Sequence, residues 1–209
     1  MLKSLITTVS LVFISVSIIA QTDEINISAS FAQSIELRIS GNSSISFTFS
    51  TLSDYEVGKI GNASFEVASS TSFEVSASFT PFTNENGDQL DLINLAYCIA
   101  VEDGRAGEAG IRWNFGTPDY PMFDLTSNAN WSHTYTGVFV ASQTEKTILT
   151  PGSSGNAGEF EENRFLIQIR LGTINDHADM GGRLSLLDQN IPPGIYTCTM
   201  TLTAIPSIT

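Results

Sequence analysis

The stretch from Ile195 to Ala204 alternates strictly between two kinds of side chain. Larger or apolar residues hold every second position: Tyr196, Cys198, Met200, Leu202 and Ala204. The positions between them are an isoleucine and four threonines. A period of two residues is typical of a β-strand with one face buried and one in water. The pattern predicts a strand that follows the turn Pro192–Gly194, and the bulk of its inner row favours a central place in a sheet.

Similar alternation recurs in short segments along the chain. We expect strands at 24–30, 33–40, 44–50, 63–68, 72–79, 137–141, 146–149 and 164–171. The turn 69–71 predicts a hairpin, and the continuous apolar run 90–101 predicts a strand buried on both faces. Amphipathic helical periodicity is not evident in any long window. About ten short strands predict an all-β fold, an antiparallel β-sandwich of Ig-like or pilin-like type.

The first 20 residues have the organisation of a secretory signal peptide. Lys3 supplies a positive charge, Leu5 to Ile19 is apolar, and Ala20 precedes a cleavage expected before Gln21. A membrane anchor is the alternative, but the run is shorter than the ~20 apolar residues of a spanning helix. We therefore expect residues 21–209 to form a single exported sandwich domain, secreted or at the cell surface. The Gly- and Pro-rich segment 151–158 predicts a surface loop within it rather than a linker.

Charge and cysteine content narrow the possible partners. The net charge of −13 and the absence of basic clusters argue against nucleic acid and anionic lipid. We expect no membrane span after the signal. Cys98 and Cys198 are the two cysteines, and in an exported chain they predict one disulfide bond, with two buried thiols as the alternative.

Two quoted stretches carry a family resemblance. The run ISFTFSTLSDYEVGKIGNASFEVASSTSFEVSASF and the closing IPPGIYTCTMTLTA resemble secreted bacterial surface β-sandwich proteins, of the WxL-like, pilin-like and Bacteroidetes types. The chain departs from them because it has no Trp-x-Leu pair near its C-terminus and no positively charged face. The resemblance implies a cell-surface or matrix role without enzymatic activity.

Residues suited to catalysis do not form a recognisable constellation. The histidines are His133 and His177, and Gly152–Gly155 lacks the strand-to-helix context of a nucleophile elbow. The acids Glu159, Glu161 and Glu162 give no spacing that would indicate a glycosidase. We expect no enzyme activity and no cofactor.

Metal binding is also not favoured. The segment Asn84–Asp91 resembles the first half of a calcium loop but lacks the acidic residue that completes one. A second acidic cluster is Asn175–Asp179. We interpret both segments as solvated turns and expect no metal site.

Two functions remain from different classes. The first is a structural subunit of a fibre, pilus-like appendage or matrix, which would associate with itself or with other surface proteins. The second is a carbohydrate-binding or adhesion module that presents loop aromatics to a glycan, with Trp113, Tyr120 and Trp131 as candidate ligand-binding residues. The extended arm Gln21–Ser40 suits donation to a neighbouring subunit, but we favour its being the first strand of its own sandwich.

Overall fold

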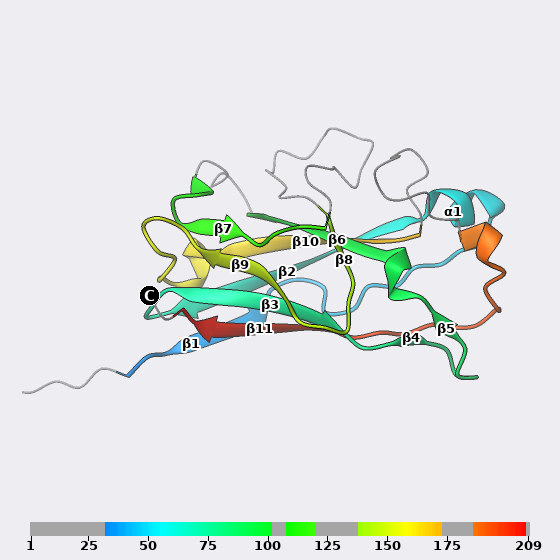
Figure 1. Ribbon diagram of the computed structural model, residues 1–209, viewed down its shortest axis with the longest axis horizontal. Helices are drawn as coiled ribbons and strands as arrows, with labels where there is room; N and C mark the ends of the chain where they lie inside the picture. The colour runs from blue at the N-terminus through cyan, green and yellow to red at the C-terminus, as the bar shows by residue number, and fades with distance from the viewer. Residues whose placement is uncertain (1–31, 102–107, 120–137, 173–185, 208–209) are drawn as a thin grey trace, which may run out of the picture. The chain divides into compact units, whose positions relative to one another are not determined.

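The structure, a computed structural model, describes residues 32–101, 108–119, 138–172 and 186–207. The strands and helices described there lie in the compact unit Gln33–Thr209 and form two main antiparallel sheets (Figure 1). Sheet A has the strand order β1 (Ile35–Ile39), β2 (Lys59–Ser69), β10 (Arg164–Leu171), β6 (Leu95–Val101) and β8 (Phe139–Val140). Sheet B has the order β11 (Met200–Pro206), β3 (Phe73–Phe79), β9 (Lys146–Pro151) and β7 (Trp113–Phe115). A separate hairpin pairs β4 (Phe82–Thr83) with β5 (Gln89–Leu90). The predicted all-β sandwich is therefore confirmed.

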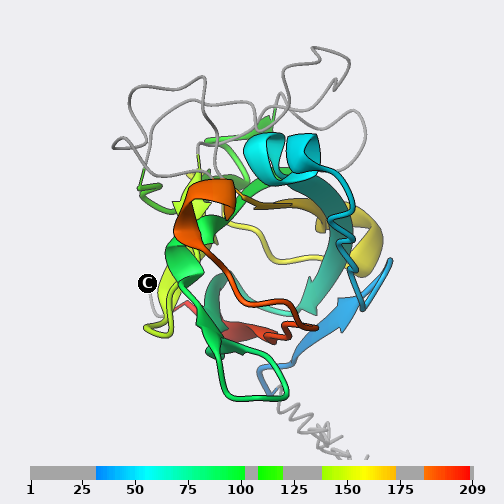
Figure 2. The ribbon, with the colours of Figure 1, turned by 90° about the vertical axis from the view of Figure 1, so that its right-hand side faces the viewer.

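Short helical turns connect the strands. They are α1 (Leu52–Val57) and the 3-10 turns η1 (Leu92–Asn94), η3 (Phe160–Glu162) and η5 (Leu186–Gln189). Thr51 and Asp54 form a capping box that starts α1. Figure 2 faces the end of the unit where α1 and η5 are in contact. Within the described residues, no helix has the length and apolar character needed to cross a membrane.

The core lies between the inner faces of the two sheets. Strand β6 is buried at every position, as its continuous apolar run predicted, and it lies between β10 and β8. The centre of the Tyr97 ring of β6 lies 5.4 Å from the ring centre of Phe79 in sheet B and 5.3 Å from that of Phe139 in β8. Burial raises the pKa of the Tyr97 hydroxyl, with a smaller contribution from Asp119. Each such buried aromatic or aliphatic side chain contributes roughly 1.5–3 kcal/mol to folding.

The hairpin predicted around residues 69–71 is wrong. Strand β2 pairs with β1 and β10 in sheet A, whereas β3 pairs with β11 and β9 in sheet B, so the chain crosses from one sheet to the other. Ser69 stabilises the crossing, because its Oγ donates to the Thr71 carbonyl at 2.7 Å. A short polar turn between two alternating segments fits a hairpin and a crossing equally well.

Segment 44–50 keeps the predicted alternation of side chains but is not a strand. Ile45, Phe47 and Phe49 are half-buried against the core, and the residues between them are exposed. The segment packs closely against Gly61 of β2, because the Ile45 side chain fills the space that a Cβ on Gly61 would occupy. Hydrophobic contact fixes the segment here without hydrogen bonding it into a ladder.

The closing strand is an edge strand, so its predicted central position is wrong. β11 pairs with β3 from Met200 to Pro206, and within the described residues no strand pairs with its other side. The alternation itself is confirmed: the inner row is half-buried and the threonines are exposed. β11 lies beside β1, the edge strand of sheet A, where the two sheets approach each other.

Candidate functional site

The unpaired side of β11 is the first candidate site. Thr197 exchanges backbone hydrogen bonds with Thr83 at 2.8 and 3.1 Å, and the Thr199 carbonyl accepts from Thr80 at 2.9 Å. These odd-numbered residues direct their backbone groups toward β3 and β4. In an antiparallel ladder, alternate residues point their N–H and C=O groups to opposite sides. The even-numbered residues, with Met200 and Leu202 at the centre, therefore present their backbone groups to the open side.

From Ile195 to Ile205 this edge lacks the charges and prolines that usually protect edge strands, and Pro206 ends the strand. Charges, prolines, bulges and short length prevent edge-to-edge association in natural sheets. β1 carries Glu36 and Arg38, and β7 and β8 have only 3 and 2 residues. The stretch Ile195–Ile205 contains no charged residue and no proline. Among the described strands, β11 presents the long uncharged edge.

The side chains along this edge are incompletely covered. The inner row, including Cys198, is only half-buried although it packs against the core. Burial raises the pKa of the Cys198 thiol, so this group stays protonated at neutral pH. On the outer face, Ile195 is 81% exposed and Ile205 is 50% exposed. These two isoleucines frame the threonine row and add apolar surface at both ends of it.

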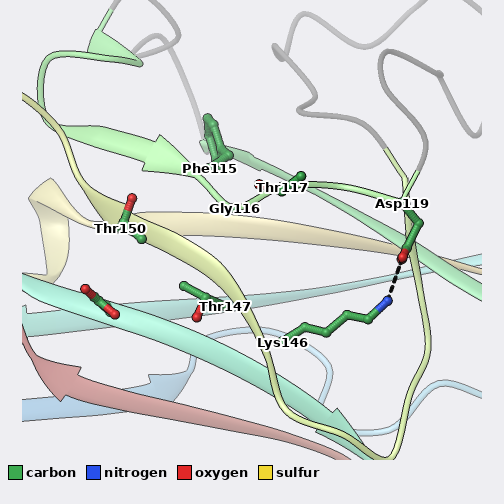
Figure 3. A pocket seen from close by; sticks show the side chains of 8 residues that line it. Phe115, Gly116, Thr117, Asp119, Lys146, Thr147 and Thr150 are labelled. Atoms are coloured by element: carbon green, nitrogen blue, oxygen red, sulfur yellow. Dashed lines mark hydrogen bonds and ion pairs between the residues drawn. The ribbon is translucent and has the colours of Figure 1, made fainter.

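A shallow hollow on sheet B is the second candidate site (Figure 3). Its volume is about 610 Å³, and its lining comes from β3, β7, β9 and the residues after β7. The residues that line it are Glu74, Phe115, Gly116, Thr117, Asp119, Lys146, Thr147 and Thr150. Phe115 is half-buried and packs against the core, opposite Leu149 in the ladder, whereas threonine and charged side chains make up most of the lining. Hydroxyl and charged groups beside an apolar residue are a combination that suits a polar ligand such as a sugar.

An ion pair holds one wall of this hollow. Lys146 Nζ donates to both carboxylate oxygens of Asp119, at 2.8 and 2.7 Å, and Asp119 Oδ2 also accepts from the Val140 N–H at 2.7 Å. A Cβ on Gly116 would overlap the Thr147 carbonyl oxygen, so glycine permits the close approach of the two chains. These contacts fix the positions of Asp119 and Lys146 relative to the sheet.

The expected disulfide between Cys98 and Cys198 does not form, and the two residues are not close. Cys98 is opposite Gln168 of β10, on the face of sheet A that points away from the core, while Ile99 and Tyr97 point into it. Cys198 packs against the core from the edge of sheet B. The body of sheet A separates the two thiols, which a count of cysteines cannot reveal.

Of the three candidate ligand-binding aromatic residues, the structure describes Trp113, which is buried. Trp113 is 0% exposed, its indole N–H donates to Asn163 Oδ1 at 2.9 Å, and its ring packs edge-on against Phe165. It therefore offers no ring to a ligand and serves the core. Tyr120 and Trp131 lie outside the described residues. Phe115, which lines the hollow, was missed because an isolated phenylalanine two positions from a tryptophan gives no signal in sequence.

The polar segments considered for chemistry have structural roles where they are described. In Asn84–Asp91, Asn84 Oδ1 accepts from the backbone of Asn86 and Asp88, which closes the β4–β5 turn. Glu162 Oε2 accepts from the Glu159 N–H at the start of η3. In Gly152–Gly155, the Ser154 hydroxyl donates to the Ile111 carbonyl. His133, His177 and Asn175–Asp179 lie outside the described residues.

A charged cluster on the outer face of sheet A joins three strands. Glu66 of β2, whose side chain is 5% exposed, accepts from Arg38 of β1 at 2.6 Å and from Arg164 of β10 at 2.9 Å. The Arg38 guanidinium also lies 3.8 Å from the centre of the Phe160 ring. Both arginines are engaged by the same carboxylate, so the cluster ties β1 to the sheet.

Comparisons with known proteins do not identify a family. No protein-family model and no curated protein matches the sequence. A family 123 glycoside hydrolase from Clostridium perfringens is similar in structure over 84% of this chain and 25% of its own, with 15% identity and a TM-score of 0.35. The chain thus spans about a quarter of the length of that hydrolase. A TM-score this low supports no inference about fold or activity.

Proposed function

We propose that this chain is an exported, non-enzymatic structural protein of the cell surface or extracellular matrix, which assembles by strand addition. The open edge of β11 carries the proposal. Its backbone groups on one side have no strand partner within the described residues, and its inner row is only half-buried. Main-chain hydrogen bonds to an added strand give affinity, and alternate side chains set its register.

The composition of the β11 edge favours assembly by strand addition over a protein that stays monomeric. An exposed edge strand is a template for another chain, and natural proteins that stay monomeric block it with charge or proline. The chain has 22 acidic and 9 basic residues, yet none lies between Ile195 and Ile205. A surface that is charged elsewhere and uncharged along one edge restricts association to that edge.

The test is a pair of matched double variants in the producing cells. Thr201→Lys with Thr203→Lys places two cations on the edge, and Ser78→Lys with Ser76→Lys places them on the neighbouring strand β3, directly opposite in the ladder. We expect the β11 variant to lose at least about tenfold of its incorporation into SDS-resistant surface material. The β3 variant should assemble like the wild type. Equal incorporation of both variants would contradict the proposal.

A second function, carbohydrate binding, is supported by the hollow on sheet B. Asp119 and Lys146 supply charged hydrogen-bonding groups beside threonine hydroxyls, and Phe115 adds apolar surface where it lines the hollow. A glycan array is the assay, with Phe115→Ala as the disruptive variant and Phe160→Ala, another half-buried ring remote from the hollow, as the control. Binding that Phe115→Ala removes and Phe160→Ala retains would establish this second function. The absence of binding to any neutral or acidic glycan would reject it.

A further inference from the structure

We propose that the partner of the β11 edge is the β11 edge of a second copy, paired antiparallel about a two-fold axis at Met200. This inference rests on the proposed assembly function and names its partner and register. In this arrangement sheet B continues without interruption from one copy into the other.

The backbone of β11 is suited to this pairing. The even-numbered residues direct their N–H and C=O groups to the open side, because the odd-numbered residues bond to β3 and β4. A two-fold axis at Met200 makes Met200 opposite Met200 of the second copy, and Cys198 opposite Leu202 of the second copy. Both are pairs of even-numbered residues, so their outward backbone groups meet as hydrogen-bonded pairs. An axis midway between two residues would instead pair even-numbered with odd-numbered residues, whose backbone groups already bond to β3 and β4.

The side chains select this register among all those with the axis at a residue. Ile195 is 81% exposed and Ile205 is 50% exposed, and both lie on the outer face. With the axis at Met200, and with the ladder extended through residues 195–199 that precede β11, Ile195 of each copy lies directly opposite Ile205 of the other. The threonines pair with threonines on the same face, Thr197 with Thr203 and Thr199 with Thr201, and cross-strand Thr–Thr pairs are favourable. Moving the axis to any other residue would leave the isoleucines without these partners.

Self-complementarity also argues for a second copy rather than a different protein. A two-fold pair requires one surface patch to match itself, and here the apolar row meets the apolar row and the threonine row meets the threonine row. Each copy carries a net charge of −13, so two copies repel over most of their surface. The stretch Ile195–Ile205 has no charge, so the copies can approach there at the lowest electrostatic cost.

Disulfide trapping tests the partner and the register together. Thr199→Cys and Thr201→Cys are made in separate chains from Gln21 onward, each carrying Cys198→Ser. Thr199 and Thr201 would form a non-hydrogen-bonded pair, in which Cα atoms are about 4.5 Å apart and a disulfide is possible. We expect a covalent dimer when the two variants are mixed and oxidised at about 100 µM, a concentration suited to a micromolar contact. Neither variant alone should form one.

A matched control and four outcomes decide the question. Ser78→Cys faces the same side as Thr201 but lies on β3, so mixing it with Thr199→Cys should give no covalent dimer. A mixed dimer, with the 199–201 link identified by mass spectrometry, supports the proposal. A dimer formed by Thr199→Cys alone or by Thr201→Cys alone overturns the register. No dimer, together with surface assembly that the lysine variant abolishes, overturns the second copy as partner but leaves the assembly function. No dimer and no effect of the lysine variant overturn both.

Discussion

Replacing Asn156 with aspartate should destabilise the fold in a pH-dependent way. Asn156 is 0% exposed, and its amide pairs with the backbone of Phe73 at the start of β3. Oδ1 accepts from the Phe73 N–H at 2.8 Å, and Nδ2 donates to the Phe73 carbonyl at 2.9 Å. In Asn156→Asp, an ionised carboxylate keeps the first bond but turns an oxygen toward the carbonyl. A protonated carboxyl donates there and retains both bonds.

The magnitude follows from linkage between ionisation and folding. Because only the protonated form fits, the folded state raises the pKa of the new carboxyl above its unfolded value near 3.9. Stability is then retained below pH ~4 and falls by about 1.4 kcal/mol for each pH unit above it, until the folded pKa is reached. A folded pKa of about 7 gives a loss of about 4 kcal/mol at neutral pH, within the range known for an uncompensated buried charge.

Urea unfolding at pH 4 and pH 7 measures this effect. The control is Asn86→Asp, which makes the same chemical change at an exposed position of the β4–β5 turn. The control should follow the wild type to within about 0.5 kcal/mol at both pH values. If Asn156→Asp loses no more stability than the control between pH 4 and pH 7, the paired amide does not anchor the 151–158 loop to β3.

Three further predictions follow from local contacts. Cys98 and Cys198 should both titrate as thiols in denaturant, and reduction should leave the mass of the native protein unchanged; a gain of two hydrogens would contradict the placement of the cysteines. Glu66→Gln should lower the free energy of unfolding by about 1–3 kcal/mol in urea, because two arginines lose their shared carboxylate; an unchanged midpoint would show that the cluster is dispensable. The hydrogen bond from Lys59 holds the pKa of Asp54 well below its usual range, so its stabilising effect is present above pH ~3.9 and is lost as the pH falls. Carboxyl NMR should record this low pKa, and Lys59→Met should raise it; a carboxyl that titrates normally would contradict it.

The sequence predicted which faces of the strands are buried, because a strand exposes its side chains with a period of two residues. β6 is buried at every position, and β10 alternates as expected except at Gln168, which is fully buried. The pairing of strands with one another was harder to predict from the sequence. The connection 69–71 crosses between sheets and segment 44–50 joins no ladder, and both outcomes depend on contacts between residues distant in sequence.

The candidate sites illustrate a similar limit. The isolated aromatics gave no indication that Trp113 is fully buried while Phe115 is half-buried and also lines the hollow, although only one residue separates them. Strand alternation would place both on one face. The difference comes from position along the strand: Trp113 packs against Phe165, whereas Phe115 is near the end of β7, where coverage diminishes. The hollow itself combines three strands and could not be assembled from any single segment.

The position of the closing strand shows why a buried face does not imply a central strand. The inner face of β11 is covered by the opposite sheet of the sandwich. Whether β11 is a central or an edge strand depends instead on its hydrogen-bonded neighbours within its own sheet. The large side chains of Met200 and Leu202 indicate only that this face is covered. The positions that alternate with these residues bear on whether the strand is at an edge. They form a row of uncharged threonines, which gives no protection against pairing with another strand. An uncharged outer row on a strand with a half-buried inner row is therefore better interpreted as an edge that receives a partner than as a centre that already has two.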